Sequence, residues 1–300
     1  MTSATPAEAT RPAPTPGRSL DRLATVLLVL PAAAWYLILL VLPLAFVIVF
    51  SFGTRSAIGG YGGGFTLDNY AAVFAGPGPF ITSLTLSIFG TLLCLLVGLP
   101  LAYFIATRAG GRKSLFIVLL VIPFWTSFLI RTYAWLIIIG PEGVAGFIGD
   151  LIGNRGFRML GTEFGVLIGM VYGYLPLMVF PLYVTLERMD RTLVEASKDL
   201  GAGRWATFRQ VTLPIAMPGL ITGSILVFIP MMGEYVIPQL LGYGHVYTIG
   251  NALVLRFLEA RNWPAGSAYA TVLIIVMLLV ITLYMWLTNR GRRSRDVSVL

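Results

Sequence analysis

The chain has 300 residues, of which 57% are hydrophobic and only 11% are charged. A soluble domain carries about 25% charged residues, so this composition excludes an ordinary water-soluble globular protein and indicates an integral membrane protein. The formal net charge of +8 is no evidence for a nucleic-acid partner, because the basic residues follow the expected membrane topology.

The N-terminal residues 1–19 are rich in Pro, Ala and Thr, a composition typical of a disordered tail. The next run, Val26–Phe50, is too long for a signal-peptide core, and no small-residue cleavage site follows it closely, so we expect a retained span. Further runs reach the roughly 20 apolar residues that a bilayer requires. These predicted spans are Ser83–Ile105, Leu115–Ile139, Phe164–Leu186, Ile215–Leu240 and Tyr269–Leu287.

The predicted fold class is therefore an all-α integral membrane protein with six transmembrane helices. A first helix with its outer loop covers residues 20–78, a five-helix core covers 79–288, and a basic tail covers 289–300. Prolines inside the spans are compatible with this prediction, because neighbouring helices can satisfy the backbone groups that they leave free.

Lysine and arginine gather on one side of the predicted spans, which the positive-inside rule makes the cytoplasmic side. The residues on that side are Arg11, Arg18, Arg22, Arg108, Arg112, Lys113, Arg188, Arg191, Lys198, Arg204, Arg209, Arg290, Arg292, Arg293 and Arg295. The opposite side carries Arg55, Arg155, Arg158, Arg256 and Arg261. We therefore expect both termini in the cytoplasm and three long outer connections, 51–82, 140–163 and 241–268.

The longest cytoplasmic connection, residues 187–214, has a mixed-charge composition. Thr192 and Glu195 have the spacing of a capping box at a helix start, and Gly201 can end that helix. The apolar residues that share one helical face are Leu193, Ala196 and Leu200. The pattern predicts a short amphipathic helix–turn–helix between two spans. Periodicity alone leaves two roles open: resting in the lipid interface, or passing a partner's movement to both spans.

The same connection resembles the EAA loop of ABC importer permeases. The family pattern is Glu-Ala-Ala, three residues, Gly, nine residues and Ile-x-Leu-Pro. The matching residues here are Glu195, Ala196, Ser197, Gly201, Val211, Leu213 and Pro214. Ser197 replaces Ala and Val211 replaces Ile, and both changes conserve volume. The resemblance implies the type I ABC importer permease fold, with Glu195 and Gly201 contacting a cleft in a cytoplasmic ATPase.

The resemblance also implies the partners of the chain. They are a second homologous permease subunit, two cytoplasmic ATPase subunits and an extracytoplasmic substrate-binding protein, assembled in a bacterial cytoplasmic (inner) membrane. The chain itself is then a transport subunit rather than an enzyme, with no cofactor of its own and with ATP bound by its partners. Residues Gly111–Ser114 end like an ATP-binding loop, but Arg112 replaces the final glycine and no strand precedes it.

Two ionisable residues, Arg131 and Glu234, fall inside predicted spans, where a charge is costly. One interpretation is a salt bridge between helices. The other is that Glu234 faces a transport pathway and helps to receive a cation, with cation–π attraction from Tyr133, Trp135 and Tyr235. The sequence leaves both interpretations open.

Three strings resemble the putrescine/spermidine branch of these permeases: Ile130–Trp135, Gly233–Pro238 and Arg261–Pro264. Permeases for iron, thiamine or aminophosphonates share some of these features and remain alternatives. The predicted outer loops carry a balanced charge, which neither attracts nor repels a polycation strongly.

Other classes of protein have less support. A gradient-driven secondary transporter would favour inverted repeats and several intramembrane acids, whereas Glu234 is the lone acid in the predicted spans. The spans show no paired carboxylates or histidine cluster for an intramembrane enzyme. The single histidine, His245, has no second metal ligand near it in sequence, so we predict no metal site. The single cysteine, Cys94, reads as a packing residue.

Overall fold

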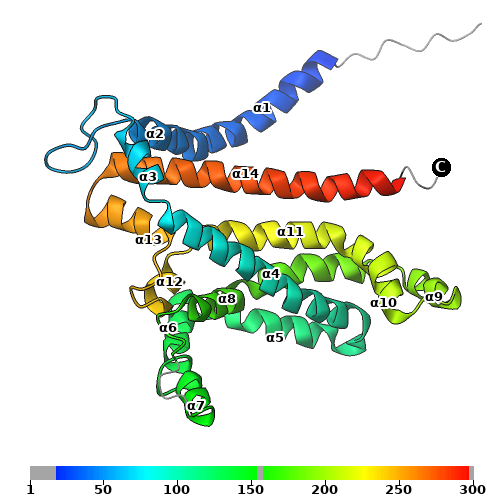
Figure 1. Ribbon diagram of the computed structural model, residues 1–300. Helices are drawn as coiled ribbons and strands as arrows, with labels where there is room; N and C mark the ends of the chain where they lie inside the picture. Colours follow the sequence, from blue (N-terminus) through cyan, green and yellow to red (C-terminus); the bar gives the residue numbers. More distant parts are fainter. Residues whose placement is uncertain (1–17, 154–157, 297–300) are drawn as a thin grey trace, which may run out of the picture. The chain divides into compact units, whose positions relative to one another are not determined.

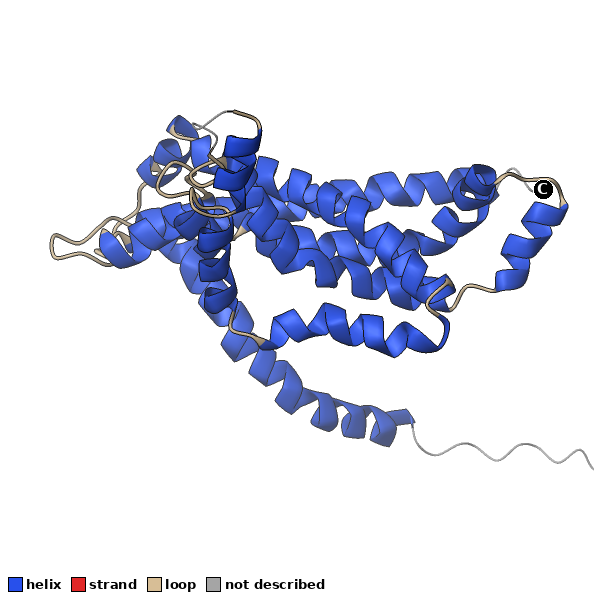
Figure 2. Cartoon of the chain, turned by 90° about the horizontal axis from the view of Figure 1, so that it is seen from below, coloured by secondary structure: helices blue, strands red, loops and turns tan. Residues whose placement is uncertain are grey.

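The computed structural model describes residues 18–153 and 158–296. Within these ranges the regular elements are helices (Figure 2), together with an isolated antiparallel β-bridge between Arg55 and Tyr61. Residues 1–17 of the predicted N-terminal tail and residues 297–300 of the predicted C-terminal tail lie outside the described residues. The chain forms two compact units, Met1–Val49 and Phe50–Leu300, which we describe separately.

The first unit contains α1 (Arg18–Tyr36), a π-helical turn (Leu37–Val41) and most of α2 (Leu42–Ser51). The stretch Leu27–Ser51 is long and apolar enough to cross a membrane, which confirms the first predicted span. The π-helical turn lies just before Pro43, which has no backbone N–H and so interrupts the regular hydrogen-bond pattern.

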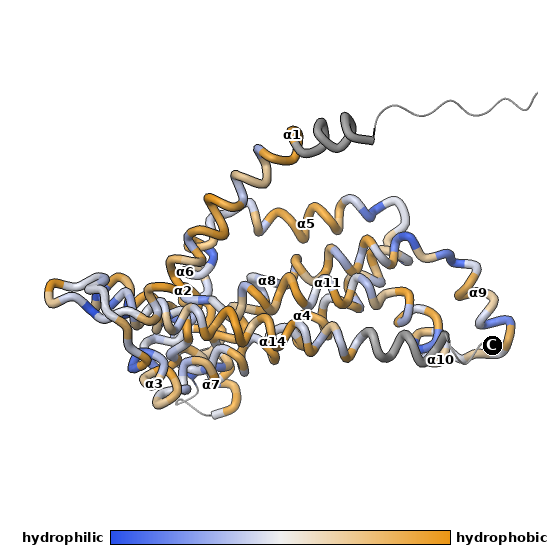
Figure 3. The backbone as a smooth tube through the Cα atoms, turned by 90° about the horizontal axis from the view of Figure 1, so that it is seen from above, coloured by the Kyte–Doolittle hydropathy of each residue, from blue (hydrophilic) through white to orange (hydrophobic). Residues whose placement is uncertain are grey.

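The second unit contains four further continuous helices that are long and apolar enough to span a membrane. They are α4 (Gly78–Thr107), α8 (Glu163–Glu187), the continuous stretch Arg204–Met232, and Trp263–Thr288 within α14 (Trp263–Asp296). The stretch Arg204–Met232 joins α10 (Arg204–Thr207), a π-helical turn (Phe208–Thr212) and α11 (Leu213–Met232). Figure 3 shows that these spans are mostly hydrophobic and that hydrophilic residues gather toward their ends.

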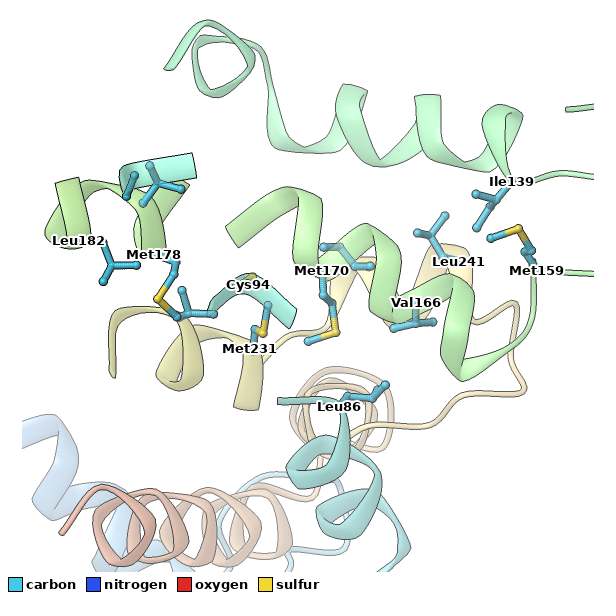
Figure 4. Close-up of a cluster of buried hydrophobic side chains, with 14 of the residues drawn as sticks. Leu86, Cys94, Ile139, Met159, Val166, Met170, Met178, Leu182, Met231 and Leu241 are labelled. Carbon is cyan, nitrogen blue, oxygen red and sulfur yellow. The ribbon is translucent and has the colours of Figure 1, made fainter. Parts of the chain in front are cut away.

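The core of the second unit lies among α4, α8 and α11, which pack against one another (Figure 1). Glycines permit the close approach, as is usual between membrane helices: a Cβ on Gly98 would lie 3.0 Å from Cγ of Met178, and one on Gly219 would lie 2.5 Å from the carbonyl oxygen of Pro181. Figure 4 shows buried side chains of this core, together with Ile139, Met159 and Leu241 from neighbouring segments. Cys94 is buried among them, as expected for a packing residue.

The predicted span Leu115–Ile139 is not one straight helix, and that part of the prediction is wrong. It consists of α5 (Lys113–Trp125) and α6 (Phe128–Ile138), which meet at an angle of 94° (Figure 1). The break falls at Thr126 and Ser127, whose ψ angles of 153° and 134° are extended rather than helical. Hydropathy did not reveal the bend because both halves are apolar.

The predicted span Ile215–Leu240 is also interrupted. Its helix ends at Met232, and the chain continues into the short α12 (Val236–Leu241), so Glu234 lies in the break. Pro238 contributes to the interruption. In a continuous helix the carbonyl of Glu234 would accept the N–H four residues later, which proline lacks. Here the Thr248 hydroxyl donates to that carbonyl instead, at 3.1 Å.

Short helices fill the connections at both ends of the second unit. One end holds those of the predicted outer connections: α3 (Asp68–Ala75), α7 (Val144–Leu151), α13 (Ile249–Val254) and the π-helical turn Leu255–Glu259. The other end holds the 3-10 turn Gly110–Arg112 and α9 (Arg191–Asp199). Among the described residues five continuous helices are long and apolar enough to cross a membrane, and the number is six, as predicted from the sequence, if the bent pair α5–α6 is one span.

Candidate functional site

The predicted helix–turn–helix is present as α9 followed by α10. The predicted capping box between Thr192 and Glu195 is wrong, because α9 begins earlier and Asp190 caps it. The Asp190 carboxylate accepts a hydrogen bond from the backbone N–H of Thr192 at 3.0 Å. Aspartate is among the most favourable residues at this N-cap position. This hydrogen bond lowers the pKa of Asp190, since it favours the charged carboxylate.

Gly201 terminates α9 as the sequence predicts. Its φ angle of 82° belongs to the left-handed region, where a side chain is strained. The N–H of Gly201 donates to the carbonyl of Lys198 at 2.8 Å, and the N–H of Ala202 donates to that of Ser197 at 3.1 Å. These two bonds form the Schellman arrangement that satisfies the last carbonyls of a helix.

The two short helices are fastened to each other. The hydroxyls of Ser197 and Thr207 lie 3.1 Å apart and share a hydrogen bond, so the serine that departs from the family pattern has a structural role. On the outward side Leu193, Leu200 and Trp205 are exposed by 49%, 89% and 73%. The predicted apolar face therefore faces away from this chain and is available to a partner.

Polar contacts also tie this element to the neighbouring spans. Lys113, at the start of α5, pairs with Glu187, at the end of α8, with 2.6 Å between Nζ and Oε1. Arg191 donates to the carbonyl of Ala106 in α4 at 3.4 Å. Beyond α10 the chain runs without a break into α11, so Val211, Leu213 and Pro214 belong to the same continuous helix.

Glu234 occupies the break between α11 and α12 and is only 7% exposed. Its Oε1 accepts the backbone N–H groups of Tyr235, Val236 and Ile237 at 3.0, 2.8 and 3.3 Å. Its Oε2 accepts a hydrogen bond from the Tyr174 hydroxyl of α8. These donors stabilise a buried carboxylate, and they fix its position relative to α8 and α12.

The backbone of the same break is held from the other side. The Thr248 hydroxyl reaches the Glu234 carbonyl, and Asn251 of α13 donates to Gln239 of α12 at 2.7 Å. The Ser83 hydroxyl of α4 accepts the N–H of Ile249 at 2.9 Å. Sequence reasoning missed Tyr174, Thr248 and Ser83, because no spacing pattern joins residues so far apart in the chain.

Arg131 and Glu234 do not form the salt bridge that was one interpretation of the sequence. Within the described residues the ion pair found is Lys113–Glu187. The Arg131 guanidinium instead lies 4.8 Å from the ring centre of Phe124 and 5.8 Å from that of Phe128, and its Nη1 is buried without a hydrogen-bond partner. It borders a cavity of about 10 Å³ between α6, α8 and α12, close to the minimum for one water molecule.

The predicted aromatic residues separate into different environments. Tyr235 adjoins Glu234 and donates its N–H to the carboxylate. Trp135 lies edge-on to Tyr172, with 5.3 Å between ring centres, and lines the cavity beside Arg131. Tyr133 is 54% exposed. The structure thus joins Glu234 with Tyr235, and Arg131 with Trp135. The described residues hold no cluster of three or more His, Cys, Asp or Glu suited to a metal ion.

Comparison with known proteins shows to which protein family the chain belongs. Residues 98–294 match the family described as binding-protein-dependent transport system inner membrane component. The chain belongs to this family of ABC importer permeases. It is 37% identical to the spermidine/putrescine transport system permease protein PotB of Haemophilus influenzae, over 84% of this chain and 89% of that protein. It is 36% identical to PotB of Escherichia coli K12, over 88% and 97% of the two chains.

The fold of this permease agrees with that assignment. A crystal structure of a bacterial ABC transporter involved in the import of the acidic polysaccharide alginate matches with a TM-score of 0.68 at 17% identity, covering 91% of this chain and 96% of that one. The permease is therefore a non-catalytic, multi-pass inner-membrane subunit of a binding-protein-dependent importer. It carries no cofactor of its own, and ATP is hydrolysed by a separate subunit.

Proposed function

We propose that this permease imports polyamines, with putrescine and spermidine as its substrates. The observation that carries the proposal is 36–37% identity with spermidine/putrescine permeases over 84–88% of the chain. The complex would contain a second homologous permease subunit, two cytoplasmic ATPase subunits and an extracytoplasmic binding protein. Both termini would lie in the cytoplasm, as the distribution of lysine and arginine indicates.

The environment of Glu234 supports a cationic substrate. Its four hydrogen-bond donors are neutral groups, and within the described residues no basic side chain lies within 4.0 Å of it. The carboxylate is thus held in place without having its charge cancelled. Such a charge in a membrane span attracts an ammonium group strongly, because little water screens it. Tyr235 would contribute its ring to the same cation.

Arg131, Tyr133 and Trp135 complete the proposed pathway on α6. Arg131 would supply a positive charge beside the pathway, and Trp135 an aromatic wall. The charge of Arg131 would repel an ammonium group, and the ring of Trp135 would attract it. These two opposing forces would position a cation relative to Glu234.

The proposed coupling route runs through α11. Glu195, Ala196, Ser197 and Gly201 would dock on the ATPase. The helix Arg204–Met232 has 29 residues and extends about 43 Å at 1.5 Å per residue. It connects the docking element at one end with the break that holds Glu234 at the other. Movement of α9 and α10 on ATP-driven closure would therefore reach the proposed substrate site through one continuous helix.

The substrate assignment is tested by uptake into proteoliposomes that contain the complete complex, with radiolabelled spermidine and its binding protein on the outer side. We expect ATP-dependent uptake that unlabelled putrescine and spermidine inhibit and that iron, thiamine and aminophosphonates do not. Uptake of one of the latter solutes, with none of polyamines, would retain the ABC permease and reject the polyamine proposal.

A further inference from the structure

The break that holds Glu234 lies directly against the start of α13. A Cβ on Gly250 of α13 would lie 2.5 Å from the carbonyl oxygen of Glu234 and 2.9 Å from that of Gly233. A side chain at position 250 would therefore force the two backbones apart. Both α12 and α13 lie at the same end of the second unit (Figure 1). The backbone of α13 is thus packed against the backbone of the break, and glycine permits this contact.

Thr248 is the N-cap residue of α13 and reaches the break with its side chain, which is buried. Its hydroxyl donates to the Glu234 carbonyl at 3.1 Å, which lacks a helical donor because Pro238 has no N–H. The hydroxyl hydrogen is shared with Oδ1 of Asn251 at 2.6 Å. A buried carbonyl without a donor is costly, so Thr248 stabilises the interrupted backbone at the residue that carries the charge.

Asn251 and Thr248 form the cap of α13, and Asn251 joins this cap to α12. Its Oδ1 accepts the N–H of Thr248 at 3.1 Å, and its Nδ2 donates to Oε1 of Gln239 at 2.7 Å. The helix α12 has six residues, and a helix of that length is not stable by itself. The cap is anchored in turn to α4, where the Ser83 hydroxyl accepts the N–H of Ile249. The position of α12 therefore depends on α13 as well as on its packing against α6 and α8.

The position of α12 in turn determines where the Glu234 carboxylate lies. The N–H groups that donate to its Oε1 come from Tyr235, Val236 and Ile237, at the start of α12. If α12 shifts, these donors move with it, and the carboxylate follows because hydrogen bonds to an ionised group are strong. The cap of α13 thus acts on the charge through the backbone of the break.

We propose that Thr248 and Asn251 are positioning residues for transport, which hold Glu234 in the place where it receives the cationic substrate. Because α13 belongs to the predicted outer connection 241–268, a movement of that connection would then change the position of the charge. The inference rests on the proposed function for the role of Glu234 as the cation acceptor. It adds residues that act through Glu234 and that lie in a different element.

The first measurement is spermidine uptake by the complete complex in proteoliposomes. Thr248→Val keeps the side-chain shape and removes the hydroxyl, and it should raise KM about fivefold while the maximal rate stays nearly unchanged. Thr248→Ser retains the hydroxyl and should restore the wild-type KM. Thr271→Val is the matched control, because this buried threonine of α14 donates to the Ser267 carbonyl of its own helix, and it should leave KM unchanged.

A double-mutant cycle shows whether Thr248 acts through Glu234. Residues that act through one another have effects that do not add. In the Glu234→Gln background there is no charge to position, so Thr248→Val should cause no further increase in KM. The same fivefold increase in both backgrounds would overturn the proposal, because Thr248 would then act independently of the carboxylate.

The second measurement is amide hydrogen exchange at residues 235–237 in the complete complex without solute, which does not depend on what the permease transports. Thr248→Val should accelerate this exchange about fivefold, and Thr248→Ser should not. Gln239, whose side chain is exposed, offers a second pair of variants in case Thr248→Val fails to fold. Gln239→Met removes the acceptor of Asn251 and should accelerate the exchange, whereas Gln239→Glu keeps an acceptor oxygen and should not.

The two measurements separate this inference from the proposed function. Absence of polyamine uptake by the wild-type complex would reject the proposed function, and the exchange data would still test the link between α13 and the break. Exchange that both Thr248→Val and Gln239→Met leave unchanged would overturn the inference whichever solute is imported. Faster exchange with an unchanged KM would overturn it as well, because the cap of α13 would then serve the fold alone.

Discussion

At the scale of single residues, the proposed function gives Glu234 two roles that one substitution can separate. It organises the break through three backbone N–H groups and the Tyr174 hydroxyl, and it places a negative charge within the membrane-spanning unit. The first role needs acceptor oxygens, whereas the second needs the charge. Glutamine retains one acceptor oxygen and the side-chain length but is neutral.

We therefore expect Glu234→Gln to fold and to raise the KM for polyamine uptake about tenfold, the effect of about 1.4 kcal/mol. Tyr174→Phe is the matched control, because it removes one donor and leaves the charge, and it should change KM much less. Uptake kinetics in proteoliposomes measure both variants. An unchanged KM in Glu234→Gln would mean that the carboxylate only organises the backbone.

Gly201 and Gly203 form a matched pair in the proposed coupling element. Both have open space where a Cβ would be placed, but φ is 82° at Gly201 and −67° at Gly203. Gly201→Ala should destabilise the end of α9 by about 1–2 kcal/mol, whereas Gly203→Ala should not. We expect faster amide exchange at the end of α9 and weaker substrate stimulation of ATPase activity only in Gly201→Ala. Equal behaviour of the two variants would contradict this account.

At the scale of elements, the sequence predicts where spans exist better than where they bend. Long apolar runs predicted the spans, because the bilayer imposes a minimum length on a helix that crosses it. The break at Thr126–Ser127 and the break around Glu234 remained hidden, because apolar residues continue on both sides. Pro238 was visible in the sequence, but its effect depends on Thr248, which replaces the missing donor from a distant element.

The contact between α8 and α11 provides a prediction at this scale. A Cβ on Gly219 would lie 2.5 Å from the Pro181 carbonyl oxygen and 2.6 Å from Oγ1 of Thr185. Gly219→Ala should thus force the two helices apart and destabilise the permease by about 1–3 kcal/mol. Gly233→Ala, where no atom lies within 4 Å, is the control. Thermal unfolding in detergent should show a lower Tm for Gly219→Ala than for Gly233→Ala, and equal values would refute the packing argument.

At the scale of the whole molecule, the proposed orientation follows from the basic residues. Ile58 and Leu200 are comparably exposed, by 92% and 89%, and lie at opposite ends of the second unit. In intact cells a membrane-impermeant maleimide should label Ile58→Cys and should label Leu200→Cys only after permeabilisation. Cys94 is buried and gives the background signal. The reverse pattern would invert the topology and remove the docking loop from the ATPase side.

The site was predicted from the sequence to different extents. The helix–turn–helix that we propose as the coupling element was recognisable because its residues are contiguous and their spacing is fixed by one short helix and its glycine terminus. Glu234 was recognisable because an acid inside a predicted span is energetically costly. Its partners Tyr174 and Thr248 come from other elements, so the sequence around Glu234 could not indicate them. The sequence suggested a salt bridge between Arg131 and Glu234, and the structure does not contain it.

The most direct test of an ATP-driven polyamine importer is substrate-stimulated ATPase activity in the reconstituted complex, with the binding protein loaded with putrescine or spermidine. The account predicts stimulation by the loaded binding protein, and its loss when Glu195 and Gly201 of this chain are both replaced. Polyamine uptake that continues without any ATPase subunit would contradict the account and favour a carrier driven by an ion gradient.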